Sequence, residues 1–169
     1  MMRIGTGWDI HALVPERPLV LGGVTIPHDL GEAGHSDGDV LVHAVIDALL
    51  GAAALGDIGT FFPSSEARWK DISSMELLER TLHELHGFTI GNIDCTVILE
   101  KPRLAPHIAA IRISLAEACF LPYDRVSVKA KTADGLLGEV GQGKAVIAQV
   151  SILLFHTKGE VEGMADDWV

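Results

Sequence analysis

Cysteine is scarce in this chain of 169 residues, which contains only Cys95 and Cys119. The two form no C-x-x-C pair, which excludes the redox and metal motifs that are built on such a pair. Isolated cysteines behave mostly as small apolar residues of a protein interior. We therefore interpret both as buried, reduced thiols of a protein that works in the cytoplasm.

Positive charge is scarce as well. Lys and Arg number 13 against 23 Asp and Glu, which gives a formal net charge of −10. Without a basic stripe the chain lacks the means to neutralise a nucleic-acid backbone, so we expect no nucleic-acid partner. A small phosphorylated substrate is compatible with this charge, because metal ions, backbone N–H groups and a few local bases can bind it.

A long apolar run is also missing. The most apolar stretch, residues 40–55, is interrupted by His43 and Asp47 and is too short to span a bilayer. Residues 1–5 lead directly into patterned sequence, with no basic segment followed by an apolar one, so we expect no signal peptide. The predicted protein is soluble and cytoplasmic, and it has no membrane partner.

Composition and periodicity indicate the fold class. Apolar residues make up 48% of the chain and charged residues 21%, as in a globular protein, and we predict one domain at 1–157 with an acidic tail at 158–169. The expected strands are 2–9, 19–26, 89–99, 125–131 and 145–155, and the expected helices are 40–55, 73–86 and 106–120. Asp39 is expected to cap the first helix, and Pro106 to lie in the first turn of the third. This order predicts an α/β (α+β) two-layer sandwich, a mixed β-sheet with helices on one face.

Asp9, His11 and His43 form the first group of residues with chemical potential. Asp9 and His11 are two apart on a predicted strand, so they share a face, and His43 lies near the start of the first helix. One oxygen and two nitrogens suit Zn²⁺ and leave a coordination position for substrate. The alternative is a chance D-x-H pair and a hydrogen-bonded core histidine. Two observations add weight to metal binding, because a histidine without a partner is costly on an otherwise apolar helix and the preceding loop is unusually dense in polar groups. From these residues alone both interpretations stay open.

The polar loop 35–39, with the sequence H-S-D-G-D, precedes this helix. Asp37 and Asp39 can be turn and capping residues, and Gly38 can supply a positive φ. His35, Ser36 and the first N–H groups of the helix also suit a phosphate group. The two interpretations are compatible.

Two further segments, 129–135 and 101–107, lie at predicted strand and helix ends. In the first, Lys, Thr and Asp side chains suit a diphosphate with a bridging Mg²⁺, although an ordinary charged turn explains them equally well. In the second, two prolines give a rigid edge that could contact a nucleobase, but Pro106 as a helix-start residue is a sufficient explanation. His83 and His86 are three apart on a helix without an acidic or Cys partner, and we interpret them as surface residues.

Taken together, several strings resemble the 2-C-methyl-D-erythritol 2,4-cyclodiphosphate synthase family, over residues 2–156 and in the same order. They are R-I-G-x-G-x-D-x-H at 3–11, H-S-D-G-D-x-x-x-H at 35–43, D-A-L-L-G-A-A-A-L-G-D-I-G at 47–59, P-H at 106–107 and V-K-A-x-T at 128–132. The resemblance implies an enzyme of the non-mevalonate isoprenoid pathway. It would convert 4-diphosphocytidyl-2-C-methyl-D-erythritol 2-phosphate to the 2,4-cyclodiphosphate and CMP, a phosphorus–oxygen lyase reaction.

The resemblance also implies the assembly and the site. The expected assembly is a homotrimer, with the sheets packed around its axis and active sites between subunits. Zn²⁺ is expected on Asp9, His11 and His43, and Mg²⁺ or Mn²⁺ on Asp134. The implied catalytic residues are His35, Lys131, Thr132 and Asp134. The implied substrate-binding residues are Asp9, His11, His35, Ser36, Asp57, Ile58, Gly59, Phe62, Lys70, Leu99, Glu100, Lys101, Pro102, Arg103, Leu104, Ala105, Lys131, Thr132, Ala133 and Asp134.

Within that set the resemblance separates three subsites. His35, Ser36, residues 57–59 and Lys70 would contact the methylerythritol phosphate, 99–105 the cytosine and 131–134 the diphosphate. The chain differs from the family at Asp134, where Glu is usual, at 141–145, where G-R-G-E-G becomes G-Q-G-K-A, and at Ser64 and Glu66, where an acidic pair is common.

Two other hypotheses remain open. One is a phosphohydrolase in which zinc activates water and Asp37 or Asp57 is the base. The other is a non-catalytic trimeric module that binds nucleotides.

Overall fold

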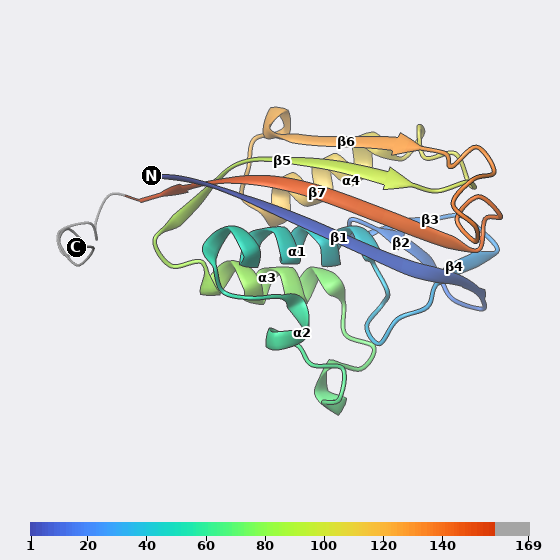
Figure 1. The fold of residues 1–169 in the computed structure, drawn as a ribbon, viewed down its shortest axis with the longest axis horizontal. Coiled ribbons are helices and arrows are strands. Elements are labelled where there is room, and N and C mark those ends of the chain that lie inside the picture. The colour runs from blue at the N-terminus through green and yellow to red at the C-terminus, as the bar shows by residue number, and fades with distance from the viewer. Residues whose placement is uncertain (158–169) are drawn as a thin grey trace.

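A five-stranded mixed sheet forms one layer of the protein, and helices form the other (Figure 1). The computed structural model describes residues 1–157. The strands are β1 (Met2–Pro15), β2 (Leu19–Leu21), β3 (Val24–Ile26), β4 (Leu30–Glu32), β5 (Phe88–Ile98), β6 (Val126–Lys131) and β7 (Ala145–His156). The helices are α1 (Val40–Ala53), α2 (Ile58–Phe61), α3 (Ser74–Glu84) and α4 (Ile108–Ala118), with 3-10 turns η1 (Ala67–Trp69) and η2 (Tyr123–Arg125).

The strand order in the sheet is β4-β1-β7-β5-β6. Only β5 and β6 run parallel, joined through α4, and the other neighbours are antiparallel. In Figure 1 the helices lie together on one side of the strands, with α1 against β1 and β7 and α4 behind β5 and β6. The predicted mixed sheet with helices on one face is therefore confirmed.

Two glycines of β1 allow the sheet and α1 to pack closely. A Cβ on Gly5 would lie 1.9 Å from the carbonyl oxygen of Ala48, and one on Gly7 would lie 1.9 Å from that of Ala44. Because glycine has no side chain, the backbones of β1 and α1 are in direct contact at these two points. The second and third turns of α1 are thereby held directly against the first half of β1.

Asp39 caps α1, as the sequence predicts. Its carboxylate accepts hydrogen bonds from the N–H groups of Val42 at 3.0 Å, Gly22 at 3.0 Å and Gly23 at 2.7 Å. Gly22 and Gly23 have φ of 60° and 75° and form the two-residue turn between β2 and β3. One buried carboxylate thus joins the helix N-terminus to the turn of a hairpin.

This hairpin corrects the predicted strand 19–26. The Gly22-Gly23 pair reverses the chain instead of bending one strand, because two consecutive positive φ angles suit the turn of a tight hairpin. Other elements also differ from the prediction. β1 extends six residues beyond its expected end at Asp9 to pair with β4, and neither β4 nor α2 was predicted. Helix α4 begins at Ile108 with His107 as its N-cap, so Pro106 precedes the helix.

Both cysteines are buried and free, as predicted, and burial raises the pKa of each thiol to about 12. Across residues 1–157, none of the helices combines the length and apolar character needed to cross a membrane. The predicted acidic tail, 158–169, lies outside the described residues, so the domain boundary stays a prediction.

Candidate metal centre

Asp9, His11 and His43 meet between β1 and the first turn of α1. Each offers one ligand atom, and these atoms all lie within 4.8 Å of one another. Asp9 Oδ2 is 3.1 Å from His11 Nε2 and 3.2 Å from His43 Nδ1. The alternation of β1 turns Asp9 and His11 toward the helices, and the close packing at Gly7 brings α1 above them. The structure therefore brings together the three residues predicted to bind a metal.

The second nitrogen of each imidazole also has a partner. His11 Nδ1 is hydrogen-bonded to the carbonyl oxygen of Gly38, and His43 Nε2 lies 3.0 Å from the hydroxyls of both Ser36 and Ser74. These bonds fix the rings so that the remaining nitrogens face Asp9. Metal-binding histidines are typically oriented in this way by a hydrogen bond on the other nitrogen.

The electrostatics of the group also suit a cation. Burial acts to raise the pKa of Asp9, but hydrogen bonds to His11 and His43 and their positive potential outweigh it, and the pKa falls below its usual range. Burial acts to lower the pKa of His11, but its bond to Asp9 and the charge of that carboxylate raise it. The ionised carboxylate thus attracts either a proton on the imidazole or a metal ion, and a bound metal must displace that proton. One oxygen and two nitrogens are a donor set that fits a divalent first-row metal.

A cavity of about 210 Å³ lies beside these residues. It is lined by His11, Gly34, His35, Ser36, His43, Ile58, Gly59, Phe62, Ser64, Trp69 and Leu77. Several residues predicted to bind substrate are therefore placed together here. Asp57 is the N-cap of α2, where its carboxylate accepts from the Thr60 amide and hydroxyl at 2.8 Å each, and Lys70 ends η1 without lining the cavity.

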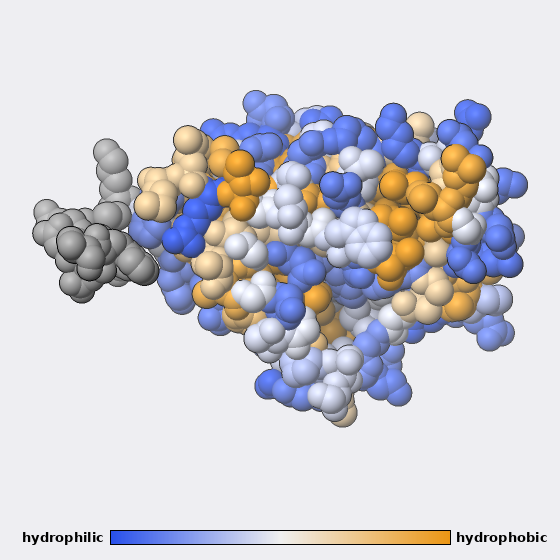
Figure 2. Space-filling model, in the orientation of Figure 1, coloured by the Kyte–Doolittle hydropathy of each residue, from blue (hydrophilic) through white to orange (hydrophobic). Residues whose placement is uncertain are grey.

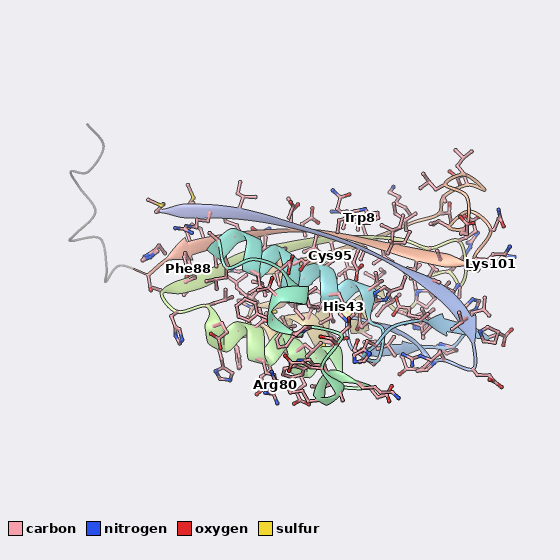
Figure 3. All side chains as sticks on the ribbon, turned by 60° about the horizontal axis from the view of Figure 1, so that its bottom comes forward. Trp8, His43, Arg80, Phe88, Cys95 and Lys101 are labelled. Atoms are coloured by element: carbon pink, nitrogen blue, oxygen red, sulfur yellow. The ribbon has the colours of Figure 1, made fainter. Side chains whose placement is uncertain are left out.

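The segments 99–105 and 131–134 form a second group at the carboxyl ends of β5 and β6. The Leu99 amide donates to the Lys131 carbonyl at 2.9 Å, and the Ala133 amide donates to Glu100 Oε2 at 3.1 Å. The Thr132 hydroxyl donates to Asp134 Oδ1 at 2.7 Å. Figure 3 shows Lys101 at the end of the sheet, well apart from His43. In one chain the predicted site residues therefore fall into two separate groups.

Three residues of the metal centre were not predicted in these roles. The Ser74 amide donates to Asp37 Oδ2 at 3.0 Å and its hydroxyl to Asp37 Oδ1, which aims that hydroxyl at His43. Trp69 lines the cavity and stacks edge-on against Phe62, with ring centroids 5.1 Å apart. The sequence indicated Asp37 only as a turn residue or a base, and Ser74 only as part of the predicted helix 73–86.

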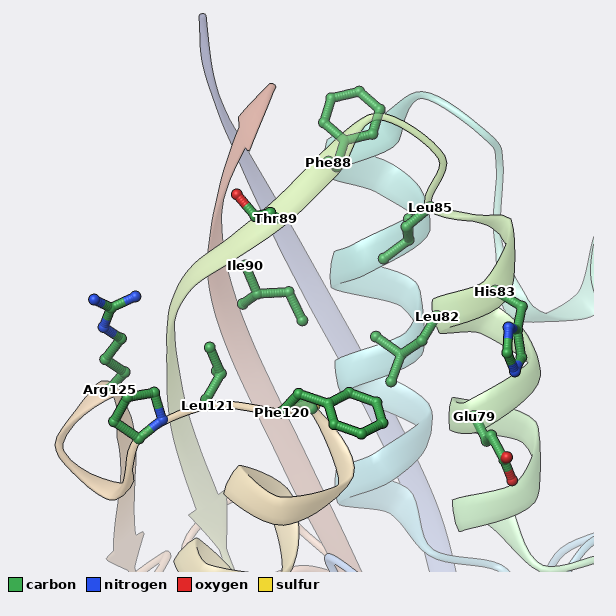
Figure 4. A pocket seen from close by; sticks show the side chains of 12 residues that line it. Glu79, Leu82, His83, Leu85, Phe88, Thr89, Ile90, Phe120, Leu121 and Arg125 are labelled. Carbon is green, nitrogen blue, oxygen red and sulfur yellow. The ribbon is translucent and has the colours of Figure 1, made fainter. Parts of the chain in front are cut away.

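A larger cavity, of about 530 Å³, lies elsewhere (Figure 4). It opens between α3, the first residues of β5 and the segment that follows α4, and mostly apolar side chains line it, among them Leu82, Ile90 and Phe120. None of the predicted site residues lines this cavity, so it is separate from the metal centre.

Comparison with known proteins decides the family. The model of the YgbB family matches residues 2–155. The chain belongs to the YgbB family. A relative from Salinibacter ruber, named 2-C-methyl-D-erythritol 2,4-cyclodiphosphate synthase, is 54% identical over 152 residues, which cover 89% of this chain and 96% of the relative. The family and the enzyme class predicted from the sequence are thereby confirmed.

Solved structures of YgbB-family proteins agree with this fold. One described as 2C-methyl-D-erythritol-2,4-cyclodiphosphate synthase in a form bound to CDP has a TM-score of 0.82 and 39% identity, covering 90% of this chain and all of that one. The Plasmodium falciparum IspF, described as a CDP complex, has a TM-score of 0.81 and 33% identity, covering 93% of this chain and 97% of that one.

Proposed function

We propose that this protein converts 4-diphosphocytidyl-2-C-methyl-D-erythritol 2-phosphate to 2-C-methyl-D-erythritol 2,4-cyclodiphosphate and CMP. The observation that carries the proposal is the convergence of Asp9, His11 and His43 beside a cavity. Membership of the YgbB family and the names of its relatives support the same reaction. The CDP in two related structures supports a cytidine nucleotide as the ligand.

In this proposal Asp9, His11 and His43 hold Zn²⁺, and Asp134 holds Mg²⁺ or Mn²⁺. When bound, such ions polarise phosphoryl oxygens and neutralise the charge that develops on them. The Asp134 carboxylate, already bonded to Thr132, lies at the carboxyl ends of two parallel strands, beside the proposed diphosphate subsite. Asp134 has a shorter side chain than the Glu that is usual here, so a metal ion bound to it must lie closer to the backbone.

The chain's own residues supply binding and orientation. His35 and Ser36, with Ile58, Gly59 and Phe62, enclose the methylerythritol phosphate in the cavity of about 210 Å³, and Asp57 contacts it from the start of α2. Lys131 and Thr132 bind the diphosphate, and 99–105 binds the cytosine. An oxygen of the substrate's 2-phosphate bonds to the β-phosphorus, the bond from that phosphorus to the CMP oxygen breaks, and CMP leaves.

No general base is needed, because the attacking phosphate is already an anion at neutral pH. The chief obstacle is that the two phosphate groups repel each other and that the flexible polyol lets them adopt many relative positions. Holding both ends in one pose can lower the barrier by roughly 7–11 kcal/mol. The rigid hydrogen-bonded loop at His35 and Ser36 is suited to this task. The buried thiols are consistent with a cytoplasmic location, which we include in the proposal.

We also propose that the active protein is a homotrimer whose sheets face its axis. The sheet face away from the helices exposes apolar side chains, including Ile4 at 75%, Trp8 at 55% and Ile10 at 43%. Figure 2 shows apolar residues gathered over the strands at both ends of the sheet, and Figure 3 shows Trp8 and His43 on opposite sides of β1. An adjacent subunit would cover this face. It would also bring its own 99–105 and 131–134 segments to the metal centre, which joins the two groups of site residues.

Product analysis tests the proposed function. The purified, metal-loaded protein is incubated with the cytidine-linked substrate, and the phosphorus products are followed by ³¹P NMR. The expected products are CMP and a cyclic diphosphate. An open bisphosphate with CMP would instead identify a phosphohydrolase, and nucleotide binding without turnover would identify a binding module.

A further inference from the structure

Arg17 lies in the turn after β1, between Pro15 and Pro18, and its side chain points back onto the segment that leads to the metal centre. The guanidinium donates from Nε to the Glu32 carbonyl at 3.2 Å and from one terminal nitrogen to the Ser36 carbonyl at 2.8 Å. The same nitrogen reaches the Gly34 carbonyl at 3.5 Å. One planar cation thus binds three alternate carbonyl groups of a single stretch of backbone.

The backbone of Arg17 is itself tightly held. A Cβ on Gly31 of β4 would lie 2.2 Å from the Arg17 carbonyl oxygen, so the two backbones are in direct contact. The other terminal nitrogen of Arg17 lies 4.0 Å from Asp71 Oδ1, and the Asp71 amide donates to the His35 carbonyl at 2.8 Å. Arg17 and Asp71, which lie next to each other, therefore both bind backbone carbonyls of the segment 32–36.

This segment determines the geometry of the metal centre. The Ser36 hydroxyl contacts His43 Nε2, and the Gly38 carbonyl, two residues further on, orients His11. His35 and Ser36 also line the cavity, whereas Arg17 does not. Any effect of Arg17 on the reaction must therefore pass through the backbone that it binds.

We propose that Arg17 is a positioning residue of the active site, which fixes the 32–38 backbone so that His35 and Ser36 meet the substrate in a productive pose. The proposal rests on the proposed function of that site. An arginine suits this role because its guanidinium offers five N–H donors in a fixed plane, whereas a lysine ammonium has a single nitrogen on a flexible stem.

Arg112 provides a matched control. Its guanidinium also binds backbone carbonyls, with Nε to Val126 at 2.7 Å and a terminal nitrogen to Tyr123 at 3.1 Å, but these lie at the start of β6 and in η2. Arg17→Gln and Arg112→Gln therefore remove comparable hydrogen bonds, one set near the metal centre and one set far from it. Arg17→Lys keeps the charge and loses the planar fork.

The experiment compares these three variants of the full chain with the unmodified protein. Measurements are metal content, steady-state kinetics, CDP affinity by calorimetry and amide hydrogen exchange of peptides that cover 33–38. For Arg17→Gln we expect kcat/KM to fall by about 10–100-fold, exchange at 33–38 to accelerate by at least about tenfold, and CDP affinity to stay within about twofold. For Arg17→Lys we expect values of kcat/KM and of exchange at 33–38 between those of Arg17→Gln and the unmodified protein. Arg112→Gln should match the unmodified protein in exchange at 33–38.

The proposal is overturned if Arg17→Gln leaves exchange at 33–38 unchanged, or if Arg112→Gln lowers kcat/KM as much as Arg17→Gln does. If Arg17→Gln does not fold, Arg17→Lys replaces it in both comparisons, exchange at 33–38 against the unmodified protein and kcat/KM against Arg112→Gln, and the same outcomes overturn the proposal. If the unmodified protein shows no turnover, the proposed function fails, and hydrogen exchange still decides whether Arg17 holds the loop.

Discussion

Each residue of the metal centre has an identifiable physical task. The two imidazoles use one nitrogen for orientation and leave the other for a ligand, and Asp9 supplies negative charge between them. Arrangements of this kind tie the protonation of the histidines to metal binding. The side-chain chemistry of the site can therefore be tested one residue at a time.

His43→Ala should abolish metal binding at this site, because two ligands on one strand hold zinc far less tightly than three. We expect the bound zinc per chain, measured by plasma emission, to fall to background and turnover to fall at least about a hundredfold. His83→Ala is the control, because His83 lies on α3 outside the three residues that converge. A His43→Ala protein that is zinc-free and fully active would contradict the assigned role.

Glu32 is a buried acid that the proposed reaction does not use. Its side chain is fully buried, Oε1 accepts from the Val40 amide at 3.4 Å, and Oε2 has no hydrogen-bond partner among the described residues. Burial, together with the nearby charge of Asp39, raises its pKa to about 10 from an ordinary 4.5. The folded protein thus keeps a proton that the unfolded chain loses above pH 4.5, and stability falls as the pH rises toward 10.

Glu32→Gln should therefore stabilise the protein at alkaline pH, because the amide has no proton to lose on unfolding. In urea unfolding with chelator present, we expect a gain of about 2–4 kcal/mol at pH 8 and little change at pH 4.5. A difference that is the same at both values would show that the carboxyl group is not held protonated.

Sequence pattern predicted the ligands of the metal centre but not the residues that support them. Asp9 and His11 followed from the two-residue period of a strand, and His43 from its conflict with an apolar helix face. Ser74 contacts His43 because α3 packs beside α1, and Arg17 contacts the backbone of 32–36 because β1 pairs with β4. Such tertiary neighbours have no periodic signal in the chain.

At the scale of elements, the packing of α1 on β1 and the hairpin β2–β3 organise the site. The hairpin was not predicted, because LVLGGVTI is equally compatible with one strand that bends at the glycines. What decides between them is Asp39, whose carboxylate binds both glycine amides from a position 16 to 17 residues later. The long helices and strands followed from their own apolar periodicity and were predicted within a few residues, except that β1 continues six residues beyond its predicted end to pair with β4.

Gly7→Ala should disrupt the contact between β1 and α1. The added methyl group would lie 1.9 Å from a helix carbonyl oxygen, so one backbone must move. We expect the free energy of unfolding to fall by about 3 kcal/mol in denaturant titrations. Gly51→Ala, on helix α1 itself, is the control, since a Cβ there meets nothing within 4 Å. It should raise the free energy of unfolding by about 0.5–1 kcal/mol. Equal effects of the two changes would contradict the close-packing account.

At the scale of the whole molecule, the two groups of site residues require explanation. The metal centre lies between β1 and α1, and the segments proposed for the nucleotide lie at the far ends of β5 and β6 (Figure 3). A second chain on the exposed sheet face would account for both the separation and the exposed apolar residues.

Trp8→Asp should separate the subunits, because it places a charge on the apolar sheet face. We expect light scattering to change from a trimer mass to a monomer mass, with most turnover lost and the circular dichroism unchanged. Ile113→Asp introduces the same charge at a residue of similar exposure, 47%, on helix α4, and should remain trimeric and active. A Trp8→Asp protein that stays trimeric would show that this sheet face is not part of the subunit interface.

The most direct test of the central claim is anomalous X-ray diffraction at the zinc edge from crystals of the zinc-loaded protein. The account predicts one strong peak per chain, within bonding distance of Asp9 Oδ2, His11 Nε2 and His43 Nδ1. A zinc peak elsewhere with none among these three atoms would contradict it.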